Sequence, residues 1–180
     1  VWVGTPDGSK YKVILKKLVL DAITDIKCPL TKKAFCQLVS GLYKELPNGG
    51  VEKIENADMK KALSKLIDKA KDGKKFYWQL VSNACIFGTK YAELIVFMPF
   101  KQTLDEIVKY NDNLEVGSWL VASASSKDNK LPYILKESGY EEINIIRFEV
   151  PISDKIFLEK RVKIFDACMN LSTEEYDKFL

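Results

Sequence analysis

The chain has 180 residues, 47% of them apolar, and a formal net charge of +3, which fits one domain or one domain with an insertion. No apolar run approaches the roughly 20 residues of a membrane span, and no secretory signal pattern opens the sequence, so we expect a cytoplasmic protein with no membrane partner. Histidine is absent, which excludes Ser-His-Asp and Cys-His catalysis and histidine-ligated zinc. Any enzymatic chemistry must therefore come from carboxylates, lysines and a metal.

The first segment predicts strands. Residues 1–5 read as a strand that Pro6 stops, and residues 11–16 and 18–27 read as two more strands of an antiparallel meander. Pro29 ends the third strand. Because Val1 lies inside an expected strand, we also expect a segment upstream of it.

The middle of the chain predicts helices. An apolar stripe over residues 31–46 favours a helix, which the Pro-Asn-Gly-Gly run after it breaks. Residues 51–74 are rich in lysine and predict an amphipathic helix in an insertion between core elements. Residues 75–87 predict a largely buried helix that ends at Gly88.

The last part alternates strands and helices. Residues 91–98 form an apolar run closed by Pro99, which is typical of a strand buried on both faces. A short helix is expected over 103–110, strands over 118–124 and 143–150, and a long helix from 153 to 170. The alternation predicts an α/β fold with one central mixed sheet and helices on both of its faces.

The cysteines and arginines indicate the redox environment of the protein and the kind of DNA contact that it can make. The four cysteines lack a CxxC pair and lie in apolar stretches, so we expect free, buried thiols in a reducing cytoplasm. Arg147 and Arg161 are the two arginines, and lysine supplies the remaining positive charge. Because lysine reads bases poorly, any contact with DNA should follow the phosphate backbone with little sequence preference.

Two acidic residues and a lysine form the first candidate site. Asp7 lies on a Pro-Asp-Gly turn, and Asp25 and Lys27 occupy alternate positions near a strand end, on one face and roughly 7 Å apart. Two carboxylates and an ammonium suit the hydrolysis of a phosphodiester with a divalent metal. A turn aspartate and an ion pair on a solvated strand face are the alternative explanation. The apolar neighbours of Asp25 favour a paired or metal-bound carboxylate.

Two helices are expected to add to this site. Thr31 can cap a helix start that would place Lys32 and Lys33 beside the acids as a seat for DNA phosphate. Gln79 shares one helix face with Ser82 and Asn83. The polar side chains on that face either hydrogen-bond to partners within the core, or Gln79 points toward the metal site.

These motifs resemble those of the PD-(D/E)XK nucleases, with the phage lambda-type alkaline exonucleases and YqaJ-like viral recombinases as the most similar branch. The resemblance rests on Thr5-Pro6-Asp7-Gly8, Asp25-Ile26-Lys27-Cys28-Pro29, Tyr77-Trp78-Gln79-Leu80 and the apolar strand that follows. Asp25 stands where that branch more often has glutamate, the helical region upstream of the first strand is absent, and the cysteines lack the spacing of the iron–sulfur subgroup.

The resemblance implies a restriction-endonuclease-like fold and a metal-dependent mechanism. Asp7, Asp25 and the carbonyl of Ile26 would bind Mg²⁺ or Mn²⁺, Lys27 would assist the attacking water and the phosphate, and Gln79 would complete the catalytic set. The resemblance therefore implies a deoxyribonuclease of a bacterial or phage-infected cell, an exonuclease on duplex ends in recombination or repair. A homotrimer and a single-strand annealing partner are expected by analogy alone. The alternatives are a non-catalytic DNA-binding or assembly module of the same fold and a structure-specific endonuclease.

Overall fold

A computed structural model of the chain describes residues 5–109 and 130–169. Its main sheet contains β1 (Gly8–Ile14), β2 (Lys17–Lys27), β5 (Tyr91–Phe97) and β6 (Ile143–Glu149), and a second, two-stranded sheet contains β3 (Tyr43–Glu45) and β4 (Val51–Lys53). The helices are α1 (Lys32–Val39), α2 (Met59–Lys69), α3 (Gly73–Ile86), α4 (Lys101–Lys109), the short 3₁₀ helix η2 (Lys136–Ser138) and α6 (Ile152–Met169). None of the helices described is long and apolar enough to cross a bilayer.

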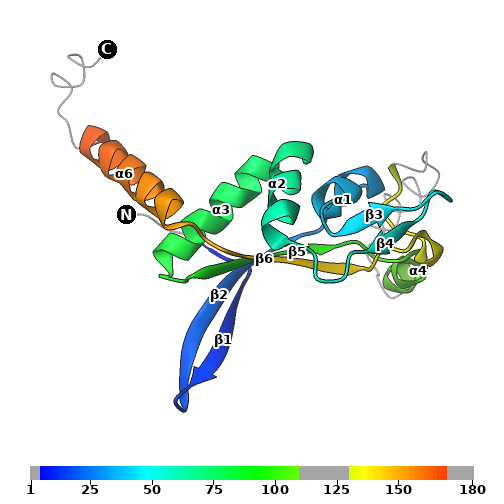
Figure 1. The fold of residues 1–180 in the computed structure, drawn as a ribbon, viewed down its shortest axis with the longest axis horizontal. Helices are drawn as coiled ribbons and strands as arrows, with labels where there is room; N and C mark the ends of the chain where they lie inside the picture. Colours follow the sequence, from blue (N-terminus) through cyan, green and yellow to red (C-terminus); the bar gives the residue numbers. More distant parts are fainter. Residues whose placement is uncertain (1–4, 110–129, 170–180) are drawn as a thin grey trace.

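The main sheet is mixed and has the order β1-β2-β5-β6. β1 and β2 form an antiparallel hairpin, β2 and β5 are parallel, and β5 and β6 are antiparallel. The parallel pair requires a long connection, and α1, α2 and α3 lie within it. Figure 1 shows the hairpin extending away from the helices. The predicted mixed α/β architecture is confirmed at this level.

A bulge in the hairpin sets which β2 side chains face the core. Lys10 pairs with Ala22 and Tyr11 with Leu20, so Asp21 is the extra residue of β2. On the far side of the bulge, Asp25 pairs with Leu94 in β5. Because paired residues share a face of the sheet, Asp25 and Lys27 lie on the same face as the core residues of β5.

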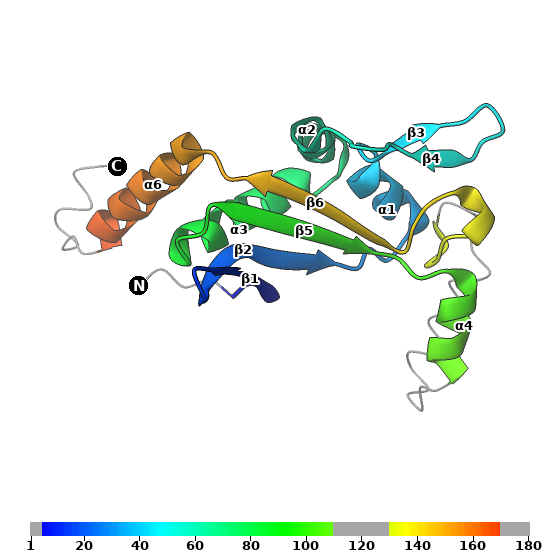
Figure 2. The same cartoon turned by 60° about the horizontal axis from the view of Figure 1, so that its bottom comes forward.

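The hydrophobic core lies between this face of the sheet and helices α1, α2 and α3, which Figures 1 and 2 show stacked on one side of it. Its fully buried members come from sheet and helices alike, among them Ile23, Phe35, Leu66, Leu80, Leu94 and Ile146. The sequence predicts α2 as part of an insertion between core elements, and in the structure its Leu66 is a core residue. The amphipathic face of α2 therefore packs into the main core.

The expected helical layer on the second face of the sheet does not appear in the ranges that the structure describes. The aliphatic side chains of Ile26, Ile143 and Ile145 on that face are about half exposed. Apolar residues on both sides of a strand predicted burial on both sides. Here the second side instead combines exposed aliphatic groups with ion pairs.

The ion pairs on the second face surround one buried carboxylate. The side chain of Glu93 is only 4% exposed and contacts the guanidinium of Arg147 at 2.5 Å and the amine of Lys10 at 3.1 Å. Arg147 also binds Asp21 at 2.6 Å, and Lys12 binds the other oxygen of Asp21 at 2.6 Å. Glu93 therefore depends on these cations, since a buried charge is tolerated only when it is paired.

Several sequence predictions fail or fall outside the described residues. The helix predicted over 31–46 ends at Val39, residues 43–45 form β3 instead, and residues 51–53 form the unpredicted strand β4. Cys28, expected to be buried, is exposed. The strands predicted over 1–5 and 118–124 lie wholly or almost wholly outside the described residues.

The early end of α1 has a steric cause at Gly41. A β-carbon built on Gly41 would lie 2.3 Å from Cα of Ala62 in α2. The chain therefore turns here against α2, and the apolar residues that follow pack from β3. We expect Gly41→Ala to lower the free energy of unfolding by about 1–3 kcal/mol, because backbone must move to accept the methyl group. Gly50→Ala is the control in chemical denaturation, because its β-carbon would approach only the Asn48 side chain at 3.3 Å and the Ser138 carbonyl at an ordinary contact distance of 3.6 Å. Equal losses in the two variants would contradict this account.

Candidate active site

Asp25, Lys27 and Gln79 meet at the edge of the core, the arrangement that the resemblance led us to expect. The Nζ atom of Lys27 lies 2.7 Å from Oδ2 of Asp25 and donates to Oε1 of Gln79 at 3.3 Å. Nε2 of Gln79 donates to Oδ1 of Asp25 at 3.4 Å. The two β2 residues point the same way because they are two apart on a strand, and α3 supplies the glutamine from the helical layer above. The cluster is therefore held between a strand and a helix of the core.

Asp7 joins the same cluster from the turn before β1. Its Oδ2 accepts a hydrogen bond of 2.7 Å from the backbone N–H of Ile26, which lies between Asp25 and Lys27. This hydrogen bond lowers the pKa of Asp7, while partial burial opposes the shift and contacts with Asp25 and Lys27 favour it. The hairpin thus brings the two carboxyl groups into contact although 17 residues separate them in the chain. We name the four side chains of Asp7, Asp25, Lys27 and Gln79 the carboxylate–amine cluster.

The Asp25 carboxyl is buried and ion-paired. It is 1% exposed, and its Oδ2 has no hydrogen bond within the described part of the chain, although the Lys27 amine lies close to it. Burial raises the pKa of Asp25, and the neighbouring Asp7 raises it further, whereas Lys27 lowers it. A carboxylate in this position remains charged only at a cost in folding free energy. Such groups are typical of functional sites.

Lys27 is fixed from several sides. Besides Asp25 and Gln79, its amine lies 4.9 Å from the centroid of the Phe76 ring, a cation–π distance. Its side chain is 20% exposed, so the ammonium remains open to solvent and to a ligand. Phe76 was not among the predicted site residues. It lies three residues before Gln79 on α3, so helical periodicity alone placed both side chains on one face.

The donors of the cluster suit a hard divalent cation. Mg²⁺ binds in proteins through one or two carboxylates and keeps several waters or substrate phosphate oxygens. Asp7 and Asp25 supply two carboxylates, and a cation at Oδ2 of Asp25 would share or replace the contact of that atom with the Lys27 amine. The ranges described contain no group of three or more acidic, histidine or cysteine ligands. The residues therefore fit Mg²⁺ or Mn²⁺ completed by substrate, and not a metal held entirely by protein side chains.

The remaining predicted residues lie nearby with other contacts. Ile26 donates its backbone N–H to Asp7, and its side chain is exposed on the opposite face of the sheet. Thr31 caps α1, its hydroxyl accepting from the backbone N–H of Ala34. Lys32 donates its backbone N–H to Leu131, and Lys33 is exposed. The carbonyl of Ile26 as a metal ligand and Thr31, Lys32 and Lys33 as DNA contacts stay predictions.

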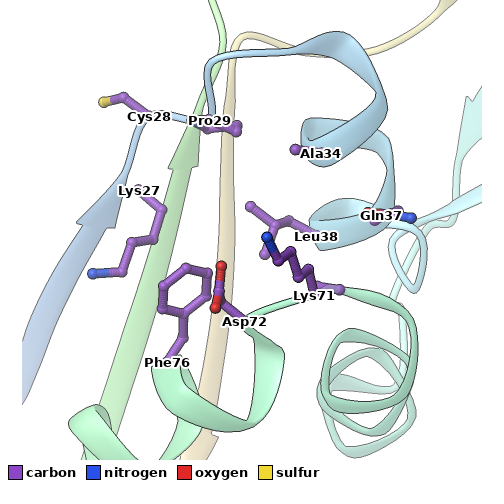
Figure 3. A pocket seen from close by; sticks show the side chains of 10 residues that line it. Lys27, Cys28, Pro29, Ala34, Gln37, Leu38, Lys71, Asp72 and Phe76 are labelled. Atoms are coloured by element: carbon purple, nitrogen blue, oxygen red, sulfur yellow. The ribbon is translucent and has the colours of Figure 1, made fainter. Parts of the chain in front are cut away.

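A pocket of about 210 Å³ opens beside the cluster, between the end of β2, α1 and the junction of α2 with α3. Sequence reasoning did not identify it, because its walls come from three separate segments. We name it the Phe76 pocket; its walls include Lys27, Pro29, Ala34, Leu38, Asp72 and Phe76. Figure 3 shows these side chains surrounding the opening.

No protein-family model, curated protein or solved structure matches this chain. The similarity of its motifs to those of the PD-(D/E)XK nucleases therefore stays a prediction from the residues. What the structure contributes is the arrangement of the cluster in space. The function proposed next depends on that arrangement.

Proposed function

We propose that the protein is a metal-dependent deoxyribonuclease of the PD-(D/E)XK type that hydrolyses DNA phosphodiesters, as an exonuclease on duplex ends. The observation that supports this most is the buried Asp25 carboxylate, which contacts the Lys27 amine at 2.7 Å and lies beside a second carboxylate. A buried carboxylate next to a like charge costs folding free energy. In a phosphodiesterase, the same carboxylate would serve as a metal ligand beside the Lys27 ammonium.

Each side chain has a separate role in the proposed reaction. Asp7 and Asp25 would hold one or two Mg²⁺ or Mn²⁺ ions, which when bound polarise the phosphate and activate water. Lys27 would orient the attacking water and stabilise the negative charge that develops on the phosphate oxygens. Gln79 positions the cluster, since its amide accepts from Lys27 and donates to Asp25.

DNA would reach this site through backbone contacts. Lys32 and Lys33 lie in the first turn of α1 and would contact phosphate without reading bases. Binding of this kind weakens steeply with salt. A homotrimer and a single-strand annealing partner remain part of the proposal by analogy only.

The test is release of nucleotides from linear duplex DNA in Mg²⁺ or Mn²⁺, with EDTA as the metal-free control. We expect release only with the metal and only from linear substrate, since an exonuclease requires an end. Cutting of closed circular DNA would instead favour the endonuclease alternative. No degradation of either substrate at any metal concentration would contradict the proposal.

One observation favours the non-catalytic alternative. The Lys27 amine already occupies the space next to Asp25, and the described residues bring only two carboxylates together. A DNA-binding module of the same fold would keep such an ion pair without a cation. Calorimetric titration with Mn²⁺ separates the two: a nuclease should show binding that Asp7→Ala abolishes, whereas a wild-type protein that binds no Mn²⁺ would favour the binding module.

A further inference from the structure

The Phe76 pocket shares a wall with the carboxylate–amine cluster. Lys27 belongs to both, and Figure 3 shows the Phe76 ring between the Lys27 side chain and the side chains of Asp72 and Leu38. The ring therefore has Lys27 on one side and the pocket on the other. A molecule held by Lys27 through a phosphate would have its neighbouring group at the mouth of this pocket.

The walls are mostly apolar and the rim is charged. Pro29, Ala34 and Leu38 join Phe76 in lining the interior. At the rim, neither the Lys71 amine nor the Asp72 carboxylate makes a hydrogen bond or ion pair within the described ranges, and Asp72 does not cap α3 with its side chain. An aromatic wall with a donor and an acceptor at its edge suits a flat ring that carries polar groups on its rim.

The size restricts the ligand further. Pockets that bury whole drug-sized ligands have volumes of roughly 300–1,000 Å³. At about 210 Å³ this pocket accepts one ring system and leaves the rest of a nucleotide outside. A nucleobase meets the requirements of shape, stacking and edge polarity together.

We propose that the Phe76 pocket binds a nucleobase of the DNA strand, the base of the nucleotide next to the phosphate that Lys27 contacts. This inference rests on the proposed function. Stacking on an aromatic wall is tolerant of sequence, because every base offers a π face. A base in this pocket is no longer stacked in the duplex, so a frayed or single-stranded end is the preferred substrate.

The test compares binding of single-stranded oligonucleotides that carry a normal or an abasic terminal nucleotide, at the 5′ or the 3′ end. Fluorescence anisotropy in EDTA measures affinity without cleavage. We expect loss of the terminal base at one of the two ends to weaken binding by about 5- to 150-fold, the size of one base–aromatic stack. Equal affinity for normal and abasic strands at both ends would overturn the proposal.

A matched pair of variants locates the effect. Ala34→Leu adds volume to the pocket, into which Figure 3 shows Ala34 pointing from α1, and should reduce the preference for the intact base to near unity. Ala167→Leu on the exposed surface of α6 should leave it unchanged. Thermal unfolding checks that both variants fold. The comparison of intact and abasic strands with the wild-type protein tests the proposal even if a variant does not fold.

Two further outcomes separate the possible failures. If free deoxynucleoside monophosphate binds but intact and abasic strands bind equally well, the pocket does not bind a base of a DNA strand, and the proposal is overturned. A preference for the intact over the abasic strand without metal-dependent cleavage would support the base-binding pocket and contradict the nuclease proposal. Cleavage without that preference would support the nuclease and contradict the base-binding pocket.

Discussion

Lys27→Ala is expected to lower the rate of Mg²⁺-dependent degradation of linear duplex DNA by at least about 100-fold. Removing one group that stabilises transition-state charge typically costs 100- to 1,000-fold in rate. Asp25→Asn should have an effect of at least the same size, because it removes a metal ligand. The measurement is the initial rate of nucleotide release at saturating metal.

The hairpin offers a matched control for this result. Lys12 and Asp21 form an ion pair of 2.6 Å, close to the 2.7 Å between Lys27 and Asp25, but away from the cluster. Lys12→Ala should retain the wild-type rate. Full activity in folded Lys27→Ala, or an equal loss in both variants, would remove Lys27 from the mechanism.

Arg147→Met is expected to lower the free energy of unfolding by about 3 kcal/mol, within the range for breaking a buried pair. Among the residues that the structure describes, the variant leaves buried Glu93 with Lys10 as its one remaining cation, and it also removes a partner of Asp21. For a chain of this length the loss corresponds to a fall in Tm of roughly 6–12 °C. Scanning calorimetry or thermal circular dichroism measures it.

The second arginine of the chain provides the control. Arg161 lies on α6 and stacks on the Phe157 ring at 5.1 Å, an exposed contact worth about 1 kcal/mol or less. Arg161→Met should therefore shift Tm far less than Arg147→Met. Because Arg147 lies on the opposite face of the sheet from Asp25, the rate per folded molecule should not change. Equal shifts in the two variants would show that Glu93 does not depend on Arg147.

Part of the candidate site followed from local sequence. Asp25 and Lys27 share a face because strand side chains alternate, and β2 was predicted to within one residue. Gln79 lies on a helix whose apolar pattern was equally clear. Which residues share a face of a strand or helix depends on their spacing along the chain, and the periodicity of the sequence predicts it directly. The catalytic roles of the residues stay predictions.

Other features depend on contacts between distant segments. The bulge at Asp21 could not be predicted, because it depends on how β1 pairs with β2. α1 ends where Gly41 meets Ala62, a contact that the apolar stripe through Tyr43 does not reveal. The Phe76 pocket likewise has walls from β2, α1 and α3.

The amino-acid sequence by itself determined which chemistry is open to this protein: without histidine, acids, lysines and a cation must act. It also determined most of the helices and strands, because their periodicity is local. Only the tertiary structure decided that an acid on a turn, an acid and an amine on a strand and an amide on a helix touch one another. Long-range pairing of β2 with β5 and packing of α3 on the sheet produced that contact, and neither leaves a periodic signal in the chain.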